Sequence, residues 1–133
     1  MNLKETFLYI WQLPQNLLGL ILLKIYKHEK EYHRLNGRTF YYTTEMPSGI
    51  SLGNYIIINR EDRGKDMRHE YGHTIQSRWL GWFYLLLIGL PSILWCIIDR
   101  LIVQRLVGWE RSKRIYYSMP WEHWADKLGG VKR

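Results

Sequence analysis

The residues of this sequence best suited to chemistry are His69, Glu70 and His73. In a helix, residues four apart differ by about 40° around the axis and one turn along it, so both imidazoles can reach one ion. Glu70, rotated by about 100°, can meet a water molecule on that ion. This HExxH pattern therefore predicts a zinc site with two imidazole ligands, an open position and a carboxylate that can accept a proton.

A second pair of candidate residues, Glu122 and Asp126, lies near the end of the sequence. These residues are also four apart, so both would lie on one face of a helix. Two imidazoles do not complete a zinc site. One of the two carboxylates can supply a third ligand, while the other accepts the ring N–H of a ligating histidine. The two pairs together predict one metal centre built from two helices.

With both patterns present, the chain resembles the gluzincin metallopeptidases, most closely the membrane-bound branch that includes the CAAX prenyl proteases and bacterial heat-shock membrane proteases. Their pattern is HExxH, a membrane-associated segment, and ExxAD followed by a nearby glycine, which residues 69–73, residues 122–126 and Gly129 match here. This chain is far shorter than the larger members, so the resemblance does not by itself imply their substrate chamber, chaperone-like roles or CAAX specificity. The resemblance implies zinc ligands His69, His73 and Glu122, general base Glu70 and a supporting Asp126.

Three further residues near the second motif are candidates for contact with a substrate. The hydroxyls of Tyr116 and Tyr117 could donate to the oxyanion of a tetrahedral intermediate, or the rings could instead pack as interfacial aromatics. His123 is adjacent to Glu122 but points about 100° away from it in a helix, which favours a surface or supporting position over ligation. If His123 did act as a fourth ligand, the zinc site would be closed and structural.

A β-hairpin is predicted over residues 38–60. Phe40–Thr44 and Ile50–Ile58 are rich in β-branched and aromatic residues and flank the loop Glu45–Gly49. The second of these strands could hold an extended substrate by strand addition. The preceding stretch, Lys24–Arg38, is charged and polar, which predicts a solvated connector.

The first motif should lie on a helix over residues 66–88 and the second on a helix over 120–128. Gly72 lies inside the first helix, where glycine costs about 1 kcal/mol relative to alanine, so we expect another backbone to approach it closely. The expected fold class is α+β: a mainly helical, minimal zincin-like domain spanning residues 1–133, with the β-hairpin as its sheet component.

Two uncharged stretches, Thr6–Leu23 and Trp79–Ile98, indicate a membrane-associated protein. Residues 1–26 would form an amphipathic or transmembrane helix with a break at Pro14. The second stretch is long enough to cross once, but candidate ligands precede and follow it. We therefore expect a membrane-embedded helical hairpin broken at Gly89–Ser92, with a return helix over 92–108. The alternative is a buried hydrophobic hairpin in a soluble protein.

The net charge of +7 suits an anionic partner. A nucleic-acid binder would interleave basic and aromatic residues on a polar face, which this chain does not do, so a lipid bilayer is favoured as partner and nucleic acid is not. Basic residues concentrate in Lys24–Arg78 and after Asp99, which predicts a site facing the cytoplasm. The single Cys96 excludes a disulfide within the chain and fits a reducing compartment.

These observations predict a membrane-associated zinc endopeptidase that acts on peptides or proteins. In it, Glu70 takes the proton of a water molecule that attacks a carbonyl polarised by zinc. The alternative is a non-catalytic zinc-binding membrane protein that serves as a binding partner or assembly factor. The sequence leaves the physiological substrate and the oligomeric state open.

Overall fold

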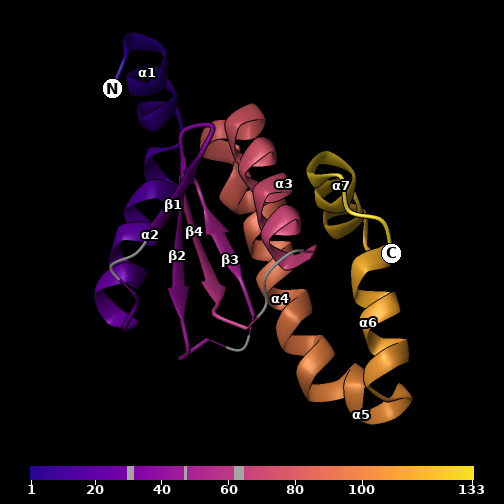
Figure 1. The fold of residues 1–133 in the computed structure, drawn as a ribbon. Helices are drawn as coiled ribbons and strands as arrows, with labels where there is room; N and C mark the ends of the chain where they lie inside the picture. The colour runs from indigo at the N-terminus through magenta and orange to yellow at the C-terminus, as the bar shows by residue number, and fades with distance from the viewer. Residues whose placement is uncertain (30–31, 47, 62–64) are drawn as a thin grey trace.

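The protein has an α+β fold in which a four-stranded sheet carries helices on both faces (Figure 1). The structure, a computed structural model, describes residues 1–29, 32–46, 48–61 and 65–133. The elements up to the end of the sheet are α1 (Leu3–Trp11), α2 (Leu13–Ile25), β1 (Tyr32–Leu35), β2 (Arg38–Thr43), β3 (Ile50–Leu52) and β4 (Tyr55–Asn59).

The sheet contains two short hairpins instead of the single predicted one. Its strand order is β1-β2-β4-β3: β1 pairs antiparallel with β2, β3 pairs antiparallel with β4, and β2 and β4 run parallel. The predicted pairing of Phe40–Thr44 with Ile50–Ile58 across a five-residue loop is therefore wrong. Gly53, with φ of +65°, makes a tight turn that splits the second segment into β3 and β4.

The connector predicted over Lys24–Arg38 also contributes to the sheet. β1 lies within it and reaches β2 through the turn Asn36-Gly37, where φ is +50° and +77°. Two consecutive residues with positive φ give the primed turn that matches the twist of a two-residue hairpin. His33 lies in β1, but its side chain is not among those that the structure describes.

The helices after the sheet begin with α3 (Lys65–Leu80), which packs on one sheet face. Phe40, Ile56 and Ile58 are fully buried there, with Met67 and Tyr71 of α3 packed against them. On the other side of α3, α7 (Pro120–Gly129) runs close beside it (Figure 1). These contacts fix α3 between the sheet and α7.

The approach of α3 and α7 requires glycine. A Cβ added at Gly72 would lie 1.9 Å from the carbonyl oxygen of Ala125, and one added at Gly129 would lie 1.9 Å from that of Arg68. The expected close approach of another backbone at Gly72 is confirmed. The two helices can therefore present side chains to a common point.

After α3 the chain turns back into one long helix, so the predicted hairpin of helices over 66–88 and 92–108 has its turn earlier in the chain than expected. The chain reverses at Gly81, where φ is +54° and a Cβ would lie 2.1 Å from the Trp11 ring. It then runs without interruption from Leu85 to Val107, as a π-helix η2 (Leu85–Gly89), α4 (Leu90–Ile98), a second π-helix η3 (Asp99–Val103) and α5 (Gln104–Val107).

The break predicted at Gly89–Ser92 is wrong because the π-helical turn changes the hydrogen-bond register directly before Pro91. The helix thereby accommodates a residue without a backbone N–H and continues. The next reversal comes at Gly108, where φ is +82°, and α6 (Trp109–Ser118) returns beside the long helix (Figure 1).

The predicted N-terminal helix over residues 1–26 is two helices, α1 and α2, bent by 84°. The predicted break lies at Gln12, two residues before Pro14, which stands in the first turn of α2, where its missing N–H removes no helical hydrogen bond. The buried Gln15 amide donates to the carbonyl oxygen of Gly81 at 2.7 Å. This contact ties α2 to the turn that follows α3.

One helix among the described residues, Leu85–Val107, is long and apolar enough to cross a membrane, with a mean hydropathy of 2.0 in its most apolar window. Only 11% of that window is buried. α1 and α2 meet the same length and composition test only when taken together as a bent pair.

Candidate metal centre

The structure brings the two predicted pairs of residues together at the interface of α3 and α7. His69 and His73 on α3 and Glu122 and Asp126 on α7 are all buried. Glu122 Oε2 lies 2.9 Å from His69 Nε2 and 3.1 Å from His73 Nε2. Two i,i+4 pairs on helices in backbone contact therefore meet at one point.

His69 is oriented by Asp126. Its Nδ1 lies 2.7 Å from Asp126 Oδ1, and Arg133 binds the same carboxylate through Nε at 2.6 Å and Nη2 at 3.1 Å. A carboxylate paired with a guanidinium is ionised and can only accept, so the His69 Nδ1–H is the donor. In the neutral ring, the lone pair of Nε2 then points toward Glu122.

His73 is oriented by Gln76, a residue that the sequence analysis missed. The Gln76 Nε2 donates to the carbonyl oxygen of Trp121 at 3.0 Å, which fixes the amide with Oε1 facing His73 Nδ1 at 2.7 Å. That oxygen only accepts, so Nδ1–H is again the donor and Nε2 carries the lone pair. The position of Gln76 three residues after His73, on nearly the same helix face, was the available signal.

Three acceptor atoms therefore converge: two imidazole lone pairs and one carboxylate oxygen. His69, His73 and Glu122 each offer a ligand atom, and these atoms lie within 4.8 Å of one another. Acceptors facing one another in a buried site need a cation or a proton between them. Two imidazoles and a carboxylate are the ligand types that zinc prefers, so the residues present fit this ion.

The same convergence explains the protonation of His69. Burial by itself lowers the His69 pKa, but hydrogen bonds to Asp126 and Glu122 outweigh burial and raise that pKa to about 10. In the metal-free molecule, a proton on His69 therefore satisfies the facing ring nitrogen and Glu122 carboxylate.

Ser92 on α4 also contacts Glu122, and no sequence signal pointed to it. Its Oγ donates to Glu122 Oε1. The other carboxylate oxygen, Oε2, is the one that faces the histidines. Ser92 therefore favours Glu122 as a ligand through one oxygen.

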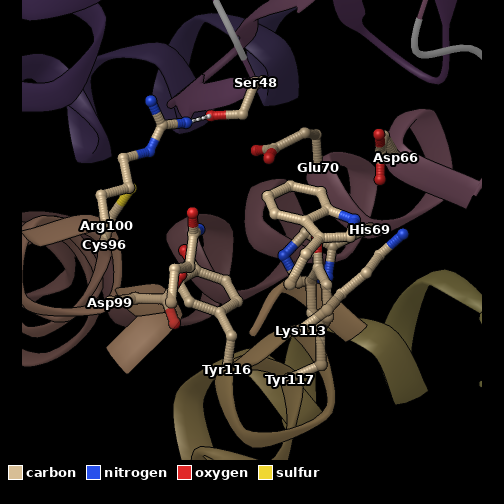
Figure 2. Close-up of a pocket in the computed structure, with 13 residues that line it drawn as sticks. Ser48, Asp66, His69, Glu70, Cys96, Asp99, Arg100, Lys113, Tyr116 and Tyr117 are labelled. Atoms are coloured by element: carbon tan, nitrogen blue, oxygen red, sulfur yellow. Dashed lines mark hydrogen bonds between the residues drawn. The ribbon is translucent and has the colours of Figure 1, made fainter. Parts of the chain in front are cut away.

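Glu70 lies beside the cluster but is not part of it. It is buried, and its carboxylate projects into a cavity below Ser48 (Figure 2). A Cβ added at Gly49 would lie 2.9 Å from Glu70 Cγ, so the chain before β3 passes directly over this side chain. Burial raises the Glu70 pKa, while His73 and His69 oppose that rise. Glu70 is thus a proton acceptor next to three ligand atoms.

The other three candidates occupy different positions. Tyr116 lines the same cavity as Glu70, and burial raises its pKa, so its hydroxyl stays protonated and can donate. The Tyr117 ring packs edge-on against His69 with 5.1 Å between ring centroids, and Arg133 stacks on it at 3.3 Å. His123 is exposed and lies outside the ligand cluster.

A groove of about 550 Å³ gives access to the cluster from between α2, β3 and α4. His69, Glu70, His73 and Glu122 all line it. β3 is the edge strand of the sheet on this side, with β4 as its one strand neighbour among the described residues. An extended chain lying in the groove would therefore pass between a sheet edge and the candidate ligands.

Comparisons of the chain with protein-family models, with curated proteins and with solved structures gave no match. The chemistry of this site must therefore be inferred from its own atoms. The ligand cluster, Glu70 and the groove are the features from which to infer it.

Proposed function

We propose that the protein is a membrane-associated, zinc-dependent endopeptidase of the gluzincin type. One observation supports the proposal most directly. The Nε2 atoms of His69 and His73, whose rings are oriented by hydrogen bonds, lie within 4.8 Å of each other and of one Glu122 oxygen. Glu70 is buried beside these atoms and is not one of the ligands. The cluster has three members among the described residues, which suits an open catalytic site better than a closed structural one.

Zinc held by His69, His73 and Glu122 would polarise a peptide carbonyl and lower the pKa of a water molecule. Glu70 accepts the proton of the attacking water and delivers it to the leaving amine. The Tyr116 hydroxyl, which faces the same groove, donates a hydrogen bond to the oxyanion of the tetrahedral intermediate. Asp126 and Gln76 keep the imidazole rings in position throughout.

Substrate backbone would pair with β3 by strand addition. The sequence predicts this role for the whole of Ile50–Ile58, but β4 lies inside the sheet between β2 and β3. Ile50–Leu52 is the part with an open edge toward the groove. Extended peptides are therefore the expected substrates.

The proposal predicts that purified protein hydrolyses peptide bonds in a broad peptide library, that a zinc chelator abolishes the hydrolysis and that added zinc restores it. Mass spectrometry of the products and metal analysis of the same sample check this. A protein that holds one zinc per chain and cleaves no peptide, in detergent and in membranes alike, would favour the non-catalytic binding partner or assembly factor instead.

We also propose that exposed apolar side chains of α1, α2 and the long helix contact the bilayer. The helix cannot pass through lipid along its whole length, because Asp99 accepts hydrogen bonds from Gln104 and from Ser112 of the basic α6. A charged helix alongside is not tolerated in the hydrocarbon core. The apolar part, Leu85–Ile98, measures about 21 Å against roughly 30 Å of hydrocarbon, so it dips into the bilayer.

This arrangement predicts that the residues before and after the long helix face the same side, which the basic residues indicate is the cytoplasm. Single cysteines at the exposed positions Glu61 and Ser118, each in a Cys96→Ser background, should react with an impermeant thiol reagent from the cytoplasmic side alone. Reaction of the two from opposite sides would show that the helix spans and would contradict the dip.

A further inference from the structure

Two cavities of different character meet at the candidate catalytic residues. One is the groove between α2, β3 and α4, and the other is a pocket between the start of α3 and α6. The residues that line both cavities are Ser48, Gly49, His69, Glu70, Cys96, Arg100 and Tyr116. A peptide placed with its reacting carbonyl at Glu70 would therefore extend into the groove on one side and into the pocket on the other.

The groove is apolar along its walls. α2 contributes Leu18 and Leu22, β3 contributes Ile50 and Leu52, and α4 contributes Ile93 and Ile97. Apolar side chains of a bound peptide would leave water on entering it, which is favourable. Polar side chains placed there would lose water without gaining partners.

The pocket carries more charged groups than the groove, beside several aromatic rings. Asp66, Asp99 and Lys113 line the pocket and not the groove (Figure 2). The Gln104 amide and the rings of Trp109 and Tyr117 also line the pocket alone, and Arg100 lines both cavities. Arg100 also donates to the Ser48 hydroxyl at 3.3 Å, above Glu70. Polar groups of a peptide that lose water on entering this pocket can form hydrogen bonds with its lining or interact with its charged groups of either sign. An apolar segment would instead cover charged groups and forfeit their hydration.

We propose that the substrates of this site carry apolar side chains on one side of the cleaved bond and polar side chains on the other, so that cleavage falls at the boundary between an apolar and a polar segment. The inference rests on the proposed peptidase function, because it takes Glu70 as the point at which the bond breaks. Each apolar side chain that fills the groove is expected to raise kcat/KM by roughly 10- to 100-fold over a polar one.

The preference can be tested with three synthetic peptides of equal length. The first has a leucine-rich block followed by a serine- and lysine-containing block, the second has the blocks reversed, and the third is polar throughout. One of the two block orders should be cleaved at the junction with a kcat/KM at least about 10-fold above the other two peptides. Equal kcat/KM for all three, or cleavage away from the junction, would overturn the inference.

The groove itself can be tested with neighbouring isoleucines of one helix. Ile97 lines the groove, whereas Ile98 does not, and their exposed fractions are 49% and 42%. Ile97→Trp should fill the groove and reduce cleavage of the preferred block peptide by about 10-fold or more, with little change for the polar peptide. Ile98→Trp should leave both rates unchanged. Equal effects of the two substitutions would contradict the assignment of the groove.

Binding of the same peptides to the Glu70→Gln variant separates this inference from the proposed function. Fluorescence anisotropy of dye-labelled peptides measures their binding without turnover. If the variant prefers one block order while the wild-type protein cleaves nothing, the peptidase proposal fails and the groove preference stands. If the variant binds all three peptides equally, the inference fails whether or not the wild-type protein is a peptidase.

Discussion

Glu70→Gln is expected to keep one zinc ion per chain and to lose roughly 100- to 10,000-fold in kcat/KM, the usual contribution of a general base. An amide of the same shape cannot accept the proton of the attacking water. Glu70 does not belong to the cluster of ligand atoms, so metal binding does not depend on it. Glutamine has the size of the buried side chain and removes a charge whose burial is unfavourable, so the substitution should not destabilise the fold.

Peptide hydrolysis and zinc content measured on the same preparations check this expectation. Glu110→Gln, which removes the same charge from the exposed start of α6, serves as the control and should behave as wild type. Retained hydrolysis in Glu70→Gln would exclude Glu70 as the base. Loss of zinc together with activity would instead place Glu70 among the ligands.

The parts of the site that follow local rules could be predicted from the sequence. The four-residue spacing of His69 with His73, and of Glu122 with Asp126, fixes the face of each helix before any tertiary contact is known. The cost of glycine inside a helix pointed to the backbone that approaches Gly72. These predictions needed only helical periodicity and the known size of a side chain.

The parts that depend on distant contacts could not be predicted. The strand break at Gly53-Asn54 is stabilised by Asn16 of α2, whose Oδ1 accepts the Asn54 N–H at 2.8 Å. The alternation of apolar residues predicts one strand over Ile50–Ile58, because this pattern contains no information about a hydrogen bond to a distant residue. Ser92 likewise reaches Glu122 only because the chain reverses at Gly81 and brings α4 back beside α7.

Glu122→Gln is expected to abolish zinc binding while leaving the fold intact. In the wild-type protein, Ser92 donates to Oε1, and Oε2 faces the Nε2 atoms of His69 and His73. A glutamine in the same rotamer would still accept from Ser92 through its oxygen. Its amide nitrogen would donate one hydrogen to each imidazole, so that two N–H groups replace the cation. Zinc content should fall from about one equivalent per chain to below roughly a tenth.

Asp126→Ala provides the graded comparison, since Asp126 contacts the cluster only through His69 Nδ1. Its zinc affinity should fall by about 10- to 100-fold, the usual effect of losing the group that orients a ligand. If the zinc content of Asp126→Ala were as low as that of Glu122→Gln, the carboxylate ligand would have been assigned to the wrong residue of α7.

Thermal unfolding distinguishes loss of the ligand from loss of the fold. If zinc binds the folded wild-type protein as proposed, zinc at 1,000 times its Kd should stabilise that protein by about 4 kcal/mol and raise the unfolding temperature. Zinc should leave the unfolding temperature of Glu122→Gln unchanged. Without metal, Glu122→Gln should unfold at or above the temperature of the wild-type protein, because its amide satisfies both imidazoles without a bound proton. A metal-free Glu122→Gln protein that unfolds well below metal-free wild type would show that the three acceptors are not arranged around a cation position.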